Sequence, residues 1–314
     1  MKMTHKTDWI IRILEKPVEM LAAEQLQREV WPGSETDVVP LHILVTAAHN
    51  GGIVIGAYKK DNRKAGEEPG LPVDSAPLAG FVFGFPGLYF TPDGPRPKHC
   101  SHQLAVHPQY RSQGLGFLLK RAQWQMVRHQ GLDLISWTFD PLLSRNAHLN
   151  IARLGAVCST YIREAYGEMQ DDLNFGIPSD RFQVDWWVNS QRVKSRLSSR
   201  TRRRLDLTHF LTAGAEIINP STPGKDRWLH PSQARLPSSS PESKADIPLL
   251  LVEIPSDFQA LRASDPPLAL EWRMSLRQIF EDLFALGYLI TDFIHLQEEI
   301  PRSYYVLSHG ESTL

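Results

Sequence analysis

Apolar and polar residues follow two different periods along the first two thirds of the chain, and the two periods alternate. Runs dominated by β-branched and aromatic residues predict strands over residues 9–14, 52–58, 78–85, 101–106, 134–139, 157–163 and 181–188. Apolar residues spaced by three and four predict helices over 16–30, 117–127 and 144–156, and 40–49 is helical or irregular. Strands and helices in this mixed order predict an α+β fold.

The last third of the chain has its own pattern. An apolar strand at 247–254, an amphipathic helix at 268–286 and strands at 288–295 and 303–307 follow a short strand at 215–219. Residues 220–246 are rich in Pro and Ser, which predicts a loop or a flexible insertion. We therefore expect one domain over residues 8–189 and an additional C-terminal α+β lobe over 190–314 that contains the flexible segment 220–246.

The most informative stretch joins a predicted strand to a predicted helix. Leu104 and Val106 lie at period two, and Pro108 ends the strand because it has no N–H to donate. Gly114 and Gly116 then precede the helix. A turn of this kind directs backbone N–H groups at whatever lies above the helix N-terminus, which is a common binding site for phosphate.

Two common phosphate motifs do not fit this turn. A P-loop needs Lys after its last glycine, where this chain has Phe117, and a dinucleotide fingerprint needs Gly where this chain has Leu119. What remains is the pattern V-x-P-x-x-R-x-x-G-x-G, from Val106 to Gly116. An ordinary strand–turn–helix with glycines for tight packing is the alternative.

This pattern and the order of elements around it resemble the pyrophosphate loop of the GNAT (Gcn5-related N-acetyltransferase) superfamily, over roughly residues 10–188. The segments Asp-Pro-Leu, Asn-Ala-His-Leu-Asn and Asp-Arg-Phe also resemble a poorly characterised bacterial branch of predicted acetyltransferases in that family. The resemblance implies an α/β/α-layered mixed sheet and an acyl-CoA-dependent N-acyltransferase. Its co-substrate would be acetyl-CoA or another short acyl-CoA such as succinyl-CoA, and no metal is expected.

The resemblance also implies which residues bind the co-substrate. The strand backbone would hold the pantetheine arm and polarise the thioester carbonyl, through Leu104, Ala105 and Val106. The turn would wrap the pyrophosphate, through Arg111, Ser112, Gln113, Gly114, Leu115 and Gly116. Asn146, near the start of the helix that resembles the second family motif, would contact the pantetheine.

Direct acyl transfer needs a general base only to accept the proton of the attacking amine. Asp140 stands at the C-terminal end of a central strand, where the sheet would open towards the acyl group. It could instead cap the turn that begins at Pro141. Glu164 is a second candidate, and a water relay would make a protein base unnecessary.

This chain differs from the family pattern at the position of the acid that protonates the leaving thiolate. Many family members carry a Tyr four residues before the glycine of the second motif, where this chain has Ile151. His148, one turn earlier, could replace it or could be a structural histidine. Tyr161 and Tyr166 are further candidates for the acid, and both could equally be packing residues. His102 and His107 flank the strand before the turn. Because strand side chains alternate between the two faces of a sheet, one of these histidines is expected to point away from the site.

The composition of the chain mainly excludes classes of partner and site. A net charge of −1 does not favour nucleic acid or an anionic membrane as a partner, and no apolar run approaches the ~18 residues that span a bilayer. The two cysteines, Cys100 and Cys158, form no disulfide framework and no metal-ligand spacing. Two cysteines without a disulfide framework fit an intracellular, cytoplasmic location best, and because residues 1–9 are polar we expect no signal peptide.

The sequence leaves open the role of one basic stretch and the identity of the acceptor substrate. The stretch could be a solvated surface or could attract nucleic acid or a phosphate; it contains Arg192, Lys194, Arg196, Arg200, Arg202, Arg203 and Arg204. We expect the acceptor to be a small amine or amino acid, with its carboxylate held by an arginine such as Arg145, Arg163 or Arg181. The alternative functions are a non-catalytic acyl-CoA-binding module and a protein- or nucleic-acid-modifying enzyme. The strand at 181–188 could be a sheet edge that pairs in a homodimer, or it could lie in the core.

Overall fold

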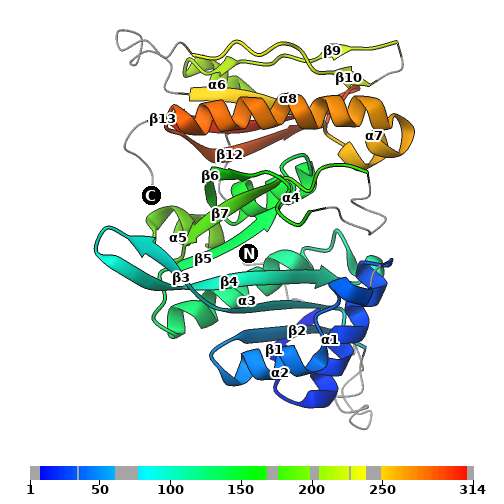
Figure 1. Ribbon diagram of the computed structural model, residues 1–314, viewed down its shortest axis with the longest axis vertical. Coiled ribbons are helices and arrows are strands. Elements are labelled where there is room, and N and C mark those ends of the chain that lie inside the picture. Colours follow the sequence, from blue (N-terminus) through cyan, green and yellow to red (C-terminus); the bar gives the residue numbers. More distant parts are fainter. Residues whose placement is uncertain are drawn as a thin grey trace, which may run out of the picture. The chain divides into compact units, whose positions relative to one another are not determined.

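The computed structural model of this protein describes residues 8–33, 35–60, 77–167, 176–198, 205–225, 228–237 and 249–309 (Figure 1). It has the mixed α+β class that the sequence predicts. Its described residues form two compact units, an N-terminal unit that ends at Ser136 and a C-terminal unit that begins at Trp137. This boundary lies within strand β5 (Leu134–Phe139), whereas the division expected at residue 189 stays a prediction.

The N-terminal unit has the element order expected from the sequence. Its elements are β1 (Trp9–Ile13), α1 (Pro17–Val30), η1 (Glu35–Asp37), α2 (Leu41–His49), β2 (Ile53–Lys59), β3 (Gly80–Thr91), β4 (Gly94–Val106), η3 (Pro108–Tyr110), α3 (Leu115–His129) and the start of β5. The strands lie in the order β1-β2-β3-β4-β5, and only β4 and β5 run parallel. Strands β3 and β4 form a hairpin longer than predicted, because their pairing continues out to Thr91 and Gly94.

Helices cover both faces of this sheet. On one face Phe81 and Phe83 of β3 belong to the same buried cluster as Met20 and Leu26 of α1. On the other face a side chain on Gly80 would meet the leucine side chains at the start of α3. Because successive strand residues face opposite sides, the sheet lies between α1 and α2 on one face and α3 on the other, which confirms the predicted layering for this unit.

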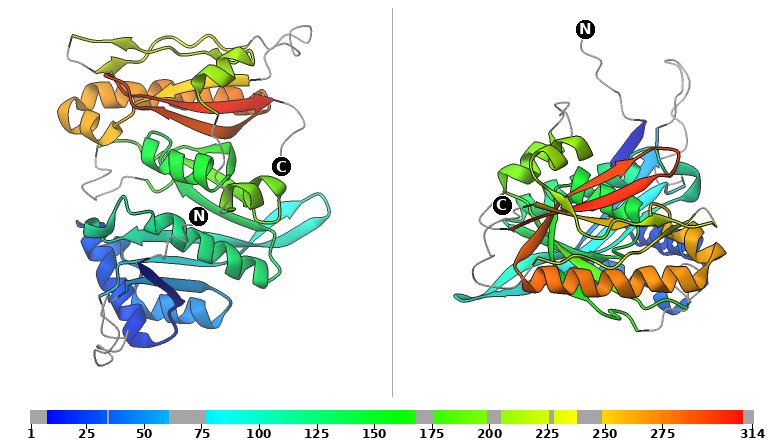
Figure 2. Two further views of the ribbon diagram at one scale, coloured as in Figure 1. Left: turned by 180° about the vertical axis from the view of Figure 1, so that it is seen from behind. Right: turned by 90° about the horizontal axis from the view of Figure 1, so that it is seen from above.

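The C-terminal unit continues the chain with a second set of elements (Figure 2). They are the end of β5, α4 (Ser144–Ala147), the π-helix η4 (His148–Arg153), β6 (Val157–Ile162), β7 (Arg181–Trp187), α5 (Gln191–Leu197), α6 (Leu207–Thr212), β8 (Glu216–Ile217), β9 (Thr222–Pro223), β10 (Leu229–His230), β11 (Leu249–Ile254), α7 (Phe258–Ser264), α8 (Pro266–Ala285), β12 (Tyr288–Leu296) and β13 (Arg302–His309). The strand order is β5-β7-β6-β12-β13-β11-β8. The predicted insertion at 220–246 includes the short ladder of β9 and β10 within its described part.

Helix α8 anchors the core of this unit, as its apolar period predicts. Trp272, Leu276 and Leu283 are fully buried. Phe280 of the same helix packs edge-to-face against Phe182 of β7, with ring centroids 4.7 Å apart. Strand β7 is not an edge, as one of the two sequence interpretations had it, because it lies between β5 and β6 and buries Trp186 completely.

The described part of the basic stretch is partly structural. Arg192 on α5 donates to the carbonyl of Gly155 at 3.0 Å and also to the carbonyl of Thr291. Arg196 forms a 2.6 Å ion pair with Asp292. A fully solvated surface is therefore wrong for these two arginines, while Lys194 on the same helix is exposed. The other basic residues lie outside the described residues: Arg200, Arg202, Arg203 and Arg204.

Membrane insertion through a helix has no support in the described residues. None of their helices combines the length and the apolar character that crossing a bilayer requires.

Candidate functional site

Strand β4 directs main-chain groups away from β3 just before the glycine turn. His107 donates its N–H to the carbonyl of Ala79 at 3.0 Å, and Ala105 pairs with Phe81 in the same antiparallel register. Hydrogen-bonded and non-bonded pairs alternate in such a ladder, so the N–H and C=O groups of Leu104 and Val106 point to the side away from β3. The described parallel register with β5 comprises only His99 with Ile135 and Cys100 with Ser136.

The three strand residues that the sequence suggested for binding the pantetheine arm differ in where their backbone groups point. The backbone groups of Leu104 and Val106 are directed away from β3, whereas Ala105 uses its own in the ladder and is fully buried. The side chain of Arg111 returns to this place, because its Nε donates to the carbonyl of Val106 at 3.4 Å.

The turn itself leaves the N-terminus of α3 open. Gly114 is the N-cap of α3 with φ 77°, in the left-handed region, and it has no side chain to cap the helix. Ser112 is also left-handed, with φ 65°. Among the described residues other than its two chain neighbours, none has an atom within 4 Å of the place where a Cβ of Gly114 would be. The first N–H groups of a helix have no intrahelical acceptor, so the residues present fit a pyrophosphate in this turn.

The two histidines that flank the strand take part in local structure. The ring of His107 accepts the N–H of Gln109 at 3.2 Å and lies 3.1 Å from the carboxylate of Glu29. His102 is the extra residue of a β-bulge, because the register passes from Gln103 to Ser101 without it. The simple alternation used for the sequence prediction therefore fails at His102, since a bulge adds one residue to one strand.

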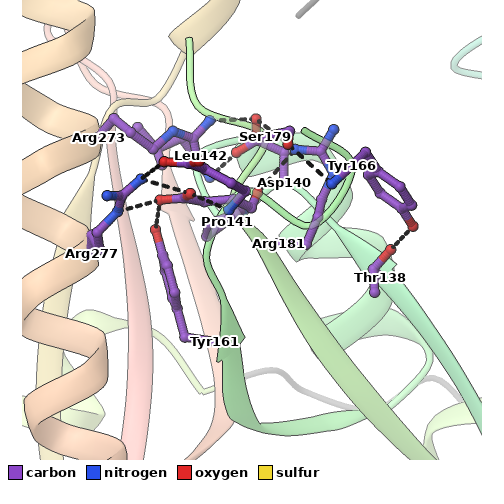
Figure 3. A network of polar contacts seen from close by, with 12 residues as sticks. Thr138, Asp140, Pro141, Leu142, Tyr161, Tyr166, Ser179, Arg181, Arg273 and Arg277 are labelled. Atoms are coloured by element: carbon purple, nitrogen blue, oxygen red, sulfur yellow. Dashed lines mark hydrogen bonds and ion pairs between the residues drawn. The ribbon is translucent and has the colours of Figure 1, made fainter. Parts of the chain in front are cut away.

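Asp140, predicted as the general base, is buried at the end of β5 in the C-terminal unit (Figure 3). Its Oδ1 accepts the N–H of Leu142 at 2.9 Å, and its Oδ2 lies 2.6 Å from Nη2 of Arg273 and 3.9 Å from Nη1 of Arg181. Both oxygens are engaged within the unit. These contacts match the turn-capping alternative, extended by an ion pair that the sequence did not indicate.

A second carboxylate beside it, Asp180, is bound even more completely. Arg277 donates to both of its oxygens at 2.8 Å, and Tyr161 donates its hydroxyl at 2.7 Å. The N–H of Glu164 adds a fourth bond at 3.0 Å. Burial raises the pKa of Asp180, but these hydrogen bonds more than offset burial and hold the pKa below its usual value.

The two candidate tyrosines differ in exposure. Burial, with the hydrogen bond to Asp180, raises the pKa of Tyr161, so its hydroxyl stays protonated and committed to that carboxylate. Tyr166 is 56% exposed. Its hydroxyl lies 2.6 Å from the hydroxyl of Thr138 (Figure 3).

The helix that resembles the second family motif is not a regular α-helix. Asn146 lies in α4 and is half-buried, and the next six residues form a π-helix in which the N–H of Leu154 reaches the carbonyl of Leu149, five residues back. This wider turn removes the α-helical spacing on which His148 was expected to share a face with Ile151. Ile151 is fully buried and His148 half-buried. Such π-segments are frequent at functional sites.

Comparison with known proteins gives structural similarity only. No protein-family model and no curated protein sequence matches the chain. Three of the similar solved structures are named as follows. The ribosomal-protein-S18-alanine N-acetyltransferase of Escherichia coli is 14% identical, with a TM-score of 0.39 over 57% of this chain and 94% of its own. NAA60 of Arabidopsis thaliana in complex with acetyl-CoA is 16% identical, with a TM-score of 0.43 over 58% and 99%.

A third similar structure comes from the family that the loop motif resembles. It is a protein of Desulfovibrio desulfuricans assigned to the GNAT family of acetyltransferases, 16% identical, with a TM-score of 0.41 over 57% of this chain and 99% of its own. TM-scores near 0.4 carry no argument about activity. The turn between β4 and α3 is the feature of this chain that bears on function.

Proposed function

We propose that this protein transfers an acyl group, acetyl by default and succinyl as the alternative, from acyl-CoA to the amine of a small molecule or amino acid. The observation that carries the proposal is Gly114, a left-handed N-cap with open space around it, at the end of a strand whose backbone points outward. A helix N-terminus left open in this way suits a pyrophosphate. The matching sequence pattern from Val106 to Gly116 supports the same activity.

Each part of the turn has a proposed role. The backbone of Leu104 and Val106 would bind the amides of the pantetheine arm by extending the ladder direction of β4. The turn from Arg111 to Gly116 would bind the pyrophosphate, with main-chain N–H groups and the exposed Arg111 side chain supplying the donors. Asn146 and His148, which lie in the other unit, stay predictions from the family resemblance.

The chemistry asks little of the protein beyond positioning. A bound thioester supplies the activated acyl group, and the acceptor amine must lose a proton to attack it. Because Arg273 and the Leu142 N–H already engage Asp140, we infer that Asp140 has a structural role and that water carries the proton. A covalent cysteine intermediate is not proposed, since Cys158 is fully buried and burial raises the pKa of its thiol.

A non-catalytic acyl-CoA-binding protein is the second candidate. It is favoured by the engaged carboxylate of Asp140 and by a fully buried Ile151 where many acetyltransferases have a tyrosine. On this alternative the protein binds acyl-CoA but releases no free CoA with any amine.

Release of free thiol separates the two functions. Purified protein is mixed with acetyl-CoA or succinyl-CoA and a panel of small amines and amino acids, and CoA release is followed with a thiol reagent. Acyl transfer predicts release that depends on one class of amine. It also predicts that Arg111→Ala raises KM for acyl-CoA more than it lowers kcat, whereas Arg128→Ala, at the other end of α3, leaves both unchanged. Binding without release from any amine would establish the second candidate.

A further inference from the structure

Helix α3 is joined to strand β4 by four buried polar side chains, Lys120 and Gln123 on the helix and His99 and Ser101 on the strand (Figure 1). Lys120 donates to the hydroxyl of Ser101 at 3.0 Å, and Oε1 of Gln123 lies 3.1 Å from the same hydroxyl. The amide nitrogen of Gln123 lies 3.1 Å from Nε2 of His99. Lys120 also donates to Oε1 of Gln123 at 2.8 Å. We call these four side chains the α3–β4 clamp.

The clamp fixes the position of α3 along β4 more strictly than apolar packing does. Elsewhere the helix packs on the sheet through Leu115 and Leu119, whose side chains a Cβ on Gly80 would meet at 3.4 and 3.2 Å. Apolar contacts have no preferred direction, so leucines alone tolerate small shifts of the helix. Hydrogen bonds require a narrow range of distance and angle, and a bonded polar network in a core specifies one arrangement.

The clamp lies between the two parts of the proposed acyl-CoA site. Lys120 follows Gly114 by six residues, which is about 9 Å along a helix. Ser101 precedes Leu104 by three residues, which is about 10 Å along a strand. The β-bulge at His102 comes between them, and a bulge bends its strand. The pyrophosphate turn and the outward-directed strand backbone are therefore connected through two rigid elements that meet at the clamp.

We propose that Lys120 and Gln123 are positioning residues for acyl-CoA, which keep the turn at the start of α3 aligned with the strand backbone that would bind the pantetheine arm. This inference rests on the proposed function of that turn. A ligand that reaches only the turn does not need the alignment, whereas acyl-CoA must bind the turn and the strand at once. Loss of the clamp therefore weakens the binding of acyl-CoA more than the binding of its diphosphate end alone.

The experiment measures how tightly two ligands bind to the full-length protein by titration calorimetry. One ligand is acetyl-CoA, and the other is adenosine 3′-phosphate 5′-diphosphate, which carries the diphosphate of CoA without the pantetheine arm. Gln123→Met removes the central amide of the clamp. We expect Kd for acetyl-CoA to rise about tenfold, as for the loss of one or two hydrogen bonds to the strand, and Kd for the diphosphate to stay within about twofold. Ser101→Ala is a smaller change and should raise Kd for acetyl-CoA about threefold.

Two control variants separate positioning from a general loss of stability. Met20→Ala removes a buried side chain of α1, on the opposite face of the sheet. It should lower the thermal midpoint but leave the ratio of the two dissociation constants unchanged. Gln123→Glu keeps both oxygens for Lys120 and Ser101, and His99 can donate to it as the other tautomer. This conservative variant should therefore keep the wild-type ratio.

Failure of the proposed function and failure of this inference give different results. If wild-type protein does not bind acetyl-CoA, the proposed function fails and the inference fails with it. If the wild type binds acetyl-CoA, an unchanged ratio in folded Gln123→Met, or an equal change in Met20→Ala, overturns the positioning role alone. Should Gln123→Met not fold, the ratio measured for Ser101→Ala decides in the same way.

Discussion

The side-chain nitrogen of Lys120 lies 2.8 Å from the amide oxygen of Gln123 in the interior of the N-terminal unit. Lys120 is 2% exposed and also donates to Ser101 at 3.0 Å. The amide nitrogen of Gln123 lies 3.1 Å from the ring of His99, which is fully buried. Burial lowers the pKa of Lys120 well below its usual value and that of His99 to about 3. Burial therefore favours the neutral form of the Lys120 amine, which helix α3 holds against the sheet.

Replacing this lysine should change how stability depends on pH. Between the lowered folded pKa and the unfolded value of about 10.4, the unfolded chain binds a proton that the folded chain does not. The free energy of unfolding of the wild type therefore rises with pH in that window. Lys120→Met lacks this slope, so we expect it to be more stable than the wild type near neutral pH, with an advantage that shrinks towards pH 9. Urea denaturation at several pH values checks this, and an advantage that grows with pH would contradict it.

Asp140 should matter for stability rather than for proton transfer. Asp140→Asn leaves the buried charge of Arg273 without its carboxylate, which typically costs about 3–5 kcal/mol. We expect a loss of that order in urea denaturation. A variant that unfolds like the wild type but loses turnover with a changed pH–rate profile would instead assign Asp140 as the general base.

The basic helix α5 offers a matched pair of substitutions. Arg196 donates to the carbonyl of Ala152 at 2.9 Å and pairs with Asp292, so Arg196→Ala should destabilise by about 1.5–3 kcal/mol, as expected for hydrogen bonds to charged groups. Lys194→Ala, two residues away on an exposed position, should stay within about 0.5 kcal/mol of the wild type. Equal effects in chemical denaturation would show that the ion pair contributes nothing.

Placing a tyrosine at position 151, where many family members have one, should not increase activity. Ile151 is fully buried within the π-helix, so Ile151→Tyr overfills a packed position and costs about 1–3 kcal/mol. We expect a lower thermal midpoint and no gain in CoA release. A variant with wild-type stability and faster release would show that this position does open onto the reacting groups.

Local patterns predicted the element order of the N-terminal unit and the turn at Gly114, because both depend on neighbours in sequence. The buried face of α3 was predicted less well. An apolar period would bury Leu118, Ala122 and Met126, but these side chains are only half-buried, while Lys120 and Gln123 are inside. Polar residues that satisfy each other in the core break the apolar period.

The C-terminal contacts were beyond sequence reasoning for a different reason. Asp140 and Arg273 are 133 residues apart, and nothing local to either indicates the pairing. The bulge at His102 and the π-helix after Ala147 likewise arise from strand register and helix packing rather than from a residue signal. Helix α7 was not predicted at all.

The most direct test of the proposed acyl-CoA site uses the two ends of α3. Gly114 and Gly131 have φ of 77° and 75°, and in the described structure no residue beyond their chain neighbours comes within 4 Å of a Cβ position at either. Gly114→Glu and Gly131→Glu therefore carry similar backbone strain, but only the first places a carboxylate in the turn proposed to bind pyrophosphate.

The measurement is the thermal midpoint of each protein with and without acetyl-CoA. At about 100 times its dissociation constant the ligand stabilises by roughly 2.7 kcal/mol, so we predict a clear rise for the wild type and Gly131→Glu and none for Gly114→Glu. A rise that survives in Gly114→Glu, or no rise in the wild type, would contradict the account and leave this turn as a structural connection.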